Sequence, residues 1–279
     1  MHTSEIDLVA FGPEHLEGAV ALSRQAAWPH RREDWQTALA LSRGIVALSD
    51  NHHVVGTALV TPYGTDCATI NMVIVDEAAR GRGLGRKLMQ AALDIGGERQ
   101  LRLVATSDGL PLYEKLGFRA VGTILQYQGN VRAVAEPDGV EPGRNSDLDA
   151  IAALDRAACE ADRRTLLGHI AKAGQFVVIR RAGQVQGFAA LRAFGRGDVI
   201  GPVVAENLQD ACSLISFFIG SRPGAFLRID ATADTAIAPW LESLGFAHVG
   251  GGITMRTGRI EAPARPHYKT YALANQAFG

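Results

Sequence analysis

The chain has 279 residues, of which 47% are apolar and 20% are charged. This composition provides enough apolar side chains for two packed domains and argues against a disordered chain. A formal net charge of −1 argues against nucleic acid or an anionic membrane as the main partner. We expect no membrane association, because the sequence contains no leader-like segment and no apolar run near the roughly 20 residues that span a bilayer.

The cysteines and histidines give no sign of a disulfide or a metal site. Cys67, Cys159 and Cys212 stand singly, which is typical of buried thiols in a reducing compartment. The eight histidines lack the spacing of metal ligands. We therefore expect a cytoplasmic protein without a bound metal, and no pattern fixes an oligomeric state.

The first part of the chain reads as a mixture of helices and strands. Apolar periodicity and turn residues predict strands at 6–11, 45–48, 54–60 and 68–75, and helices at 13–26 and 32–42. The strand that ends at residue 75 leads into the stretch that organises the rest of the chain.

That stretch is a strand, a glycine loop and a helix. Three glycines, Gly81, Gly83 and Gly85, fall within five residues, and Leu84 begins a run of apolar residues at helical spacing. Glycines let consecutive N–H groups turn the same way, toward the positive end of the helix dipole. The pattern predicts an anion cradle suited to a diphosphate.

Two familiar nucleotide fingerprints do not match. The spacing G-x-G-x-G is one residue short of the dinucleotide pattern G-x-G-x-x-G. The phosphate loop of nucleotide triphosphatases requires a glycine before its lysine, whereas Lys87 follows Arg86.

A different pattern does match, and it carries a family resemblance. Residues 80–85, Arg-Gly-Arg-Gly-Leu-Gly, resemble the R/Q-x-x-G-x-G/A signature of the GNAT N-acetyltransferases, and 112–118, Leu-Tyr-Glu-Lys-Leu-Gly-Phe, resemble the second hallmark of that family. The resemblance implies acetyl-CoA as cosubstrate. Its diphosphate would be held by the loop residues Arg80, Gly81, Arg82, Gly83, Leu84, Gly85 and Arg86.

The second half of the chain repeats the first. Residues 111–122 and 239–250 share Pro, Glu, Leu, Gly, Phe, Val and Gly at matching places, 128 residues apart (239 − 111). We expect an α/β (α+β) protein with two tandem GNAT-like domains, 1–130 and 131–279, each a mixed, mostly antiparallel sheet with helices on both faces. The second copy has neither glycine nor arginine at 203–209, so it resembles the YitH type of C-terminal domain, which lacks the diphosphate loop.

The resemblance also assigns roles around the thioester. The backbone of Val73, Ile74 and Val75 would contact the pantetheine arm, and Tyr113 would protonate the departing thiolate. A phenol with a pKa near 10 stays protonated at neutral pH, although a Tyr packed on its helix is the alternative. Ser107 stands where relatives commonly use Asn to contact coenzyme A, so that contact is a departure from the family pattern.

For the acceptor, the resemblance points to the first two helices and their connection. This segment offers Trp28, His30, Arg32, Asp34 and Trp35, which could hold an amine and a carboxylate. An ordinary helix N-terminus is the alternative. No residue stands out as the general base: His30, Asp66 and a water chain are all open.

The function expected from these features is transfer of acetyl from acetyl-CoA to the amine of a small metabolite. Acetylation of a protein or peptide amine is the alternative within the same fold. A CoA-binding sensor without catalysis is the alternative outside the enzymes.

Overall fold

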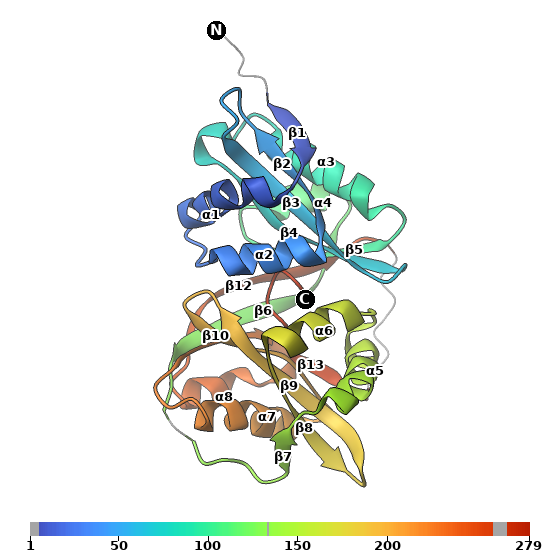
Figure 1. Cartoon of the computed structure of the whole chain (residues 1–279), viewed down its shortest axis with the longest axis vertical. Helices are drawn as coiled ribbons and strands as arrows, with labels where there is room; N and C mark the ends of the chain where they lie inside the picture. Colours follow the sequence, from blue (N-terminus) through green and yellow to red (C-terminus); the bar gives the residue numbers. More distant parts are fainter. Residues whose placement is uncertain (1–5, 133, 259–266) are drawn as a thin grey trace. The chain divides into compact units, whose positions relative to one another are not determined.

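The computed structural model describes residues 6–132, 134–258 and 267–279. The chain packs as two compact units, described separately here. The first runs to Leu103 and includes the short turn Phe194–Arg196, and the second comprises Val104–Ala193 and Gly197–Gly279. Figure 1 labels the helices and strands of both units.

The first unit is built on a mixed sheet with the strand order β1-β2-β3-β4-β5. Neighbouring strands from β1 to β4 are antiparallel, and β4 and β5 are parallel. The strands are β1 (Asp7–Ala10), β2 (Arg43–Leu48), β3 (Val54–Tyr63), β4 (Cys67–Val75) and β5 (Gln100–Ala105), of which the last begins in this unit.

Three α-helices flank this sheet: α1 (Leu16–Gln25), α2 (Arg32–Leu41) and α3 (Leu84–Gly96). α3 is amphipathic, because Leu88, Met89 and Ala92 are fully buried while Arg86, Lys87 and Gln90 are exposed. A short turn of 3₁₀ helix, Pro13–His15, precedes α1.

The second unit contains the rest of the strands in the order β12-β6-β11-β13-β10-β9-β8-β7. They are β6 (Arg119–Asn130), β7 (Val140–Pro142), β8 (Gly174–Arg181), β9 (Gln184–Phe194), β10 (Gly197–Ala205), β11 (Phe226–Thr232), β12 (Ala247–Arg256) and β13 (Lys269–Ala272). Its helices are α4 (Leu110–Lys115), α5 (Leu148–Cys159), α6 (Arg164–Ala173), α7 (Leu208–Gly220) and α8 (Ala238–Ser243). Its core consists of apolar residues of α7, α8 and the strands β6, β8, β9, β10, β11 and β13, with Phe218 fully buried among them.

The two repeated segments pair with each other. β6 and β12, which follow the repeated motif in each half, form an antiparallel ladder from Arg119↔Arg256 to Ala247↔Gln128. The other edge of β6 pairs with β11 over Phe226–Thr232. Because β6 contributes its hydrogen bonds to strands of the second half, the compact units divide after Leu103, whereas the boundary at residue 130 stays a prediction about the two sequence copies.

The fold class predicted from the sequence is confirmed: mixed sheets are flanked by helices in both units. Most predicted elements differ from the observed ones by one to four residues at their ends. The sequence did not indicate that β6 lies between β12 and β11 rather than beside a strand of its own half.

Candidate functional site

The glycine loop follows β4 and leads directly into α3. Gly81 and Gly83 have φ values of +75° and +78°, which is the left-handed region that favours glycine. Gly83 is the N-cap of α3. A Cβ built at either glycine would meet no atom within 4 Å. These positions therefore face open space, and it is their backbone conformation that favours glycine.

The backbone donors of the loop are not used by the protein. Within the described residues, no N–H group between positions 81 and 86 has a hydrogen-bond acceptor. The first N–H groups of a helix lack partners and carry the positive end of its dipole. The residues present therefore fit a diphosphate, which accepts hydrogen bonds from several adjacent N–H groups.

Four cationic side chains surround these donors. Arg80, Arg82, Arg86 and Lys87 are exposed, and in the described part of the chain none of them has a carboxylate at ion-pair distance. The Nε of Arg80 donates to the carbonyl oxygen of Val75 at 3.2 Å, which holds its guanidinium beside the end of β4. The local charge is positive although the whole chain carries a net charge of −1.

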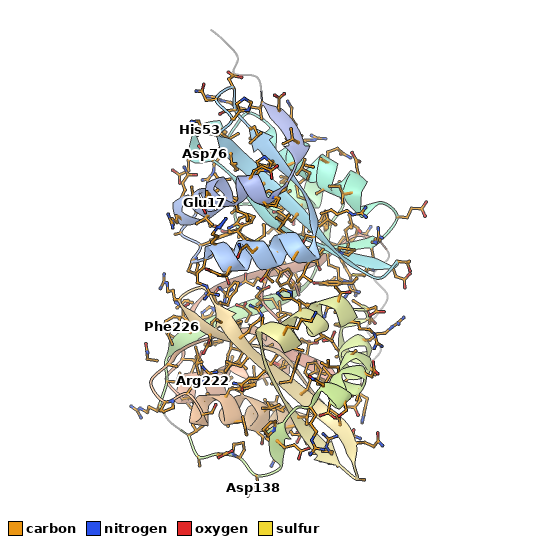
Figure 2. The ribbon with its side chains drawn as sticks, viewed as in Figure 1. Glu17, His53, Asp76, Asp138, Arg222 and Phe226 are labelled. Carbon is orange, nitrogen blue, oxygen red and sulfur yellow. The ribbon has the colours of Figure 1, made fainter. Side chains whose placement is uncertain are left out.

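The start of the loop is tied to the end of α1. Asp76, labelled in Figure 2, caps the turn Glu77–Ala79 by accepting the N–H of Ala78 at 2.8 Å. Its second oxygen accepts from the side chain of Gln25 at 3.2 Å, and the Gln25 carbonyl oxygen accepts the N–H of Glu77 at 3.1 Å. This pair of bonds fixes the direction in which the chain leaves β4.

β4 contains an irregularity just before the loop. The register with β3 shifts between Thr57↔Ile74 and Leu59↔Asn71, so Met72 and Val73 lie opposite the single residue Ala58. Met72 has a φ of +50°, and the Thr57 hydroxyl donates to its carbonyl oxygen at 2.7 Å. Such a bulge bends a strand and re-aims its backbone groups.

β4 also leaves its parallel neighbour before the loop. The ladder between β4 and β5 pairs Cys67–Thr69 with Gln100–Arg102. Among the described residues, no ladder to β5 continues beyond Thr69. Val73, Ile74 and Val75 thus lie in the part of β4 beyond its ladder with β5, where Ile74 and Val75 pair with Thr57 and Gly56 of β3.

The N-terminus of α7, at the equivalent place in the second copy, offers no such cradle. At the N-terminus of α7, the side chain of Asn207 accepts the N–H of Asp210 at 2.9 Å. The Asp210 carboxylate accepts in turn from Asn207 at 3.1 Å and from both terminal nitrogens of Arg181 at 2.6 and 2.9 Å. A capped helix end that already holds a carboxylate is unsuited to a diphosphate.

The expected acceptor residues form a cluster in the first unit. Ser23, fully buried, accepts a hydrogen bond from Trp35 Nε1 at 3.0 Å and contacts His30 Nδ1 at 3.2 Å. The Ser23 hydroxyl therefore links the Trp35 indole to the His30 ring. His30 also packs edge-on against Trp28 and Phe194, with ring centroids 5.6 Å from each.

Two of these residues are placed differently from the expectation. Trp35 is 0% exposed and stacks on Phe11, so its indole belongs to the core and does not face a ligand. Asp34 is buried and accepts from the side chain and backbone of Arg31 and from the N–H of Gly195. Its carboxylate is committed to capping α2, because three groups already donate to it.

The electrostatics of Asp34 fit this structural role. Burial by itself raises the pKa of a carboxyl, but the hydrogen bonds from Arg31 and Gly195 outweigh burial and lower the pKa of Asp34 below its ordinary value. Arg32, in contrast, is exposed and pairs with Glu17 of α1 at 3.0 Å. Trp28 is half-buried, so it is the tryptophan of this segment with surface to offer.

Tyr113 lies on α4 in the second unit. Its ring packs over Gly109 and edge-on against Phe118, with centroids 6.2 Å apart. Burial raises the pKa of Tyr113 to about 12, and its hydroxyl has no hydrogen-bond partner among the described residues. The phenol therefore stays protonated at neutral pH. Ser107 is exposed in the turn before α4.

Both halves of the chain match models of known protein families. Residues 11–118 match the family model described as "Acetyltransferase (GNAT) family", and residues 151–272 match the one described as "Acetyltransferase (GNAT) domain". The chain is a tandem GNAT acyltransferase. The two matches fall one in each half, as the repeat predicted.

Individual relatives of this GNAT protein extend over most of its length. The uncharacterized N-acetyltransferase YitH of Bacillus subtilis is 27% identical over 98% of both chains. The holothin acyltransferase of a Pseudoalteromonas species is 25% identical over 82% of this chain and 79% of its own. A proposed acetyltransferase of Pyrococcus horikoshii has the same fold, with a TM-score of 0.82 and 20% identity over 100% of this chain and 98% of that one.

Two features of this GNAT chain were missed at the level of sequence. Phe194 and Gly195, from the turn between β9 and β10, pack on the connection between α1 and α2, and no local signal marks a contact so distant in sequence. Asn71 interrupts the apolar run of β4, and a polar residue inside a buried strand is a signal that could have identified it.

In the described ranges, no helix is both long and apolar enough to cross a membrane. The same residues include no cluster of three or more His, Cys, Asp or Glu side chains that could hold a metal ion.

Proposed function

We propose that this chain transfers the acetyl group of acetyl-CoA to the amine of a small metabolite. The observation that carries the proposal is the loop at residues 81–86, with unused N–H donors at the start of α3 and four exposed cations beside them. Coenzyme A carries a diphosphate and a further phosphate, so it offers the anionic groups that such a loop binds.

Residues of the first unit would position the donor. The N–H groups of Gly81 to Arg86 hold the diphosphate, while Arg80 and Arg82 add charge. Backbone groups of Val73, Ile74 and Val75 orient the arm that ends in the thioester. When bound, acetyl-CoA supplies an activated acyl group, and a fixed orientation converts a bimolecular reaction into an effectively unimolecular one.

The acceptor would lie against the connection between α1 and α2. Trp28, His30 and Arg32 would line the acceptor site. Buried Trp35 and Asp34 would hold this segment in its conformation. Asp66 lies in the turn before β4, at the opposite end of that strand from the loop, and is therefore a poor choice of base. His30, whose Nδ1 lies 3.2 Å from the Ser23 hydroxyl, or a water chain is the better proposal for removal of the amine proton.

Tyr113 would act as the general acid. Its phenol keeps its proton at neutral pH and can pass that proton to the departing thiolate of coenzyme A. Ser107, the departure from the family pattern, would contribute no more than a peripheral contact to coenzyme A. The cytoplasmic location expected from the sequence remains a prediction.

Two measurements on the intact chain test this proposal. Titration calorimetry with acetyl-CoA establishes whether the donor binds, and a screen of amines with acetyl-CoA, read as free thiol, establishes whether it reacts. Binding with thiol release on small amines supports the proposal. Release on peptides alone would favour a protein acetyltransferase, binding without release a sensor, and no binding would refute all three.

A further inference from the structure

Asn71 is a buried polar residue in the middle of β4. It is 5% exposed, and its side-chain nitrogen donates to Thr61 Oγ1 at 2.8 Å and to the carbonyl oxygen of Thr69 at 3.3 Å. Thr61 Oγ1 lies 2.7 Å from the hydroxyl of Ser42, the C-cap residue that follows α2. A small polar network therefore lies between β3, β4 and the end of α2.

The network fixes which atom of the Asn71 amide is which. The carbonyl oxygen of Thr69 can only accept a hydrogen bond, so the amide atom that faces it must be the nitrogen. The other amide atom is therefore the oxygen. Among the described residues Asn71 Oδ1 has no hydrogen-bond partner, although it is fully buried.

A buried oxygen without a hydrogen-bond donor destabilises the folded state. Leaving a buried acceptor without a donor costs more than most hydrogen bonds contribute, and such atoms need an explanation in a folded protein. Asn71 lies just past Thr69, where the ladder to β5 ends, and directly before the bulge at Met72. It thus belongs to the stretch of β4 that continues into Val73, Ile74 and Val75.

We propose that Asn71 Oδ1 binds the acceptor substrate by accepting a hydrogen bond from its primary amine. The inference rests on the function proposed above, because the reaction requires an amine beside this stretch of β4. The thioester carbonyl and the phosphates of the donor offer only acceptor atoms to Oδ1, whereas an amine offers N–H groups. A neutral amide takes no proton, so Asn71 orients the amine and another group deprotonates it.

The pantetheine arm also contains amide N–H groups, and the experiment must separate them from the amine. The test replaces Asn71 by Leu, which has a similar size and no polar atom. Wild type and N71L are compared in acetyl-CoA affinity by calorimetry and in transfer of acetyl to hydroxylamine, a small primary amine nucleophile, with the uncatalysed rate subtracted. We expect kcat/KM for hydroxylamine to fall about tenfold, with acetyl-CoA affinity changed less than twofold.

Two further variants keep the inference falsifiable. The serine side chain of Asn71→Ser is too short to place an oxygen where the Asn71 carbonyl lies. This variant should therefore show the same fall in kcat/KM as N71L, and it tests the inference if N71L folds poorly. Thr61→Val, which removes a partner of the Asn71 nitrogen and leaves Oδ1 in place, should lose less than threefold.

Each remaining outcome has a defined meaning. Unchanged transfer in N71L, or an equal loss in Thr61→Val, overturns the role of Asn71 and leaves the proposed function standing. A loss of acetyl-CoA affinity in N71L assigns Oδ1 to the pantetheine arm and overturns the inference. Absence of acetyl-CoA binding or of any transfer by the wild type overturns the proposed function and this inference together.

Discussion

The Asp34 carboxylate accepts the backbone N–H of Gly195, with Oδ2 and the nitrogen 3.0 Å apart. These residues are separated by 161 positions in the sequence, and both belong to the first compact unit. The Asp34 carboxylate is also bound by Arg31 through two side-chain bonds of 2.8 and 3.2 Å and one backbone bond of 2.8 Å. One carboxylate thus holds together the start of α2 and a turn from the second half of the chain.

Replacing this carboxylate should lower stability. Asp34→Asn leaves Arg31 and Gly195 with a weaker, neutral acceptor, so we expect the free energy of unfolding at pH 7 to fall by about 2 kcal/mol. Urea unfolding measures the change. The matched control is Asp149→Asn, because Asp149 is 90% exposed in its ion pair with Arg164 and should change stability by less than about 0.5 kcal/mol. Equal losses in both variants would contradict a special role for Asp34.

The stabilisation by Asp34 should also depend on pH, with a defined sign. The pKa of Asp34 is lower in the folded protein than its ordinary value. The folded state therefore favours the ionised carboxylate, and its contribution is fully present above about pH 4, the value for an unfolded Asp. The contribution disappears as pH falls through the lower folded pKa. The stability gap between wild type and Asp34→Asn should be constant from pH 7 to 5 and should narrow below about pH 4. A gap that widens on acidification would contradict this account.

The loop glycines offer a test that separates binding from stability. Gly83→Ala forces a side chain into the left-handed region at φ +78°, at a cost of about 1–2 kcal/mol in the loop conformation. No neighbouring atom would be touched, so the effect is confined to the backbone. We expect the Kd for acetyl-CoA to rise about tenfold in calorimetry. Gly97→Ala is the control, because Gly97 also has a positive φ and open surroundings at the other end of α3; it should lose at least as much stability and keep its affinity.

The sequence predicted the parts of the site that depend on local signals and missed those that depend on distant contacts. The glycines and the apolar spacing of α3 are local signals, so the loop and its helix were predicted closely. Asp34 and Trp35 were predicted to face a substrate, because a sequence cannot show that Phe11 and Gly195 would cover them. The sequence also could not predict that β6 pairs with β12, because two similar strands could each pair within their own half or with the other half.

The cations of the loop should make donor binding sensitive to salt. Arg82→Gln and Arg86→Gln each remove an exposed charge beside the N–H groups that would hold the diphosphate, and each should raise the Kd for acetyl-CoA about fivefold at low ionic strength. Exposed charges are screened by salt, and at about 0.5 M sodium chloride the Debye length is only a few ångströms. The difference in Kd from wild type should therefore shrink as the salt concentration is raised to that value. Lys172→Gln, an exposed charge on α6, is the control and should leave the Kd unchanged at every salt concentration.

Tyr113 is the residue whose replacement should separate chemistry from binding. Tyr113→Phe removes only the hydroxyl, which has no partner among the described residues, so folding and acetyl-CoA affinity should be preserved. If the phenol protonates the thiolate, kcat should fall by about 10²-fold or more. Because burial raises the pKa of Tyr113 to about 12, loss of its proton should not limit the wild-type rate between pH 6 and about 10.

The control for Tyr113 is a second buried tyrosine with a similar pKa. Burial, with a hydrogen bond to Glu242 at 2.8 Å and the charge of that carboxylate, raises the pKa of Tyr127 to about 12. Tyr127→Phe loses that bond, so it should reduce the free energy of unfolding by about 1 kcal/mol while leaving kcat within twofold. A rate for Tyr113→Phe equal to that of the wild type would remove the acid role. The thiolate would then leave unprotonated or take its proton from water, and Tyr113 would serve only to pack against Phe118 and Gly109.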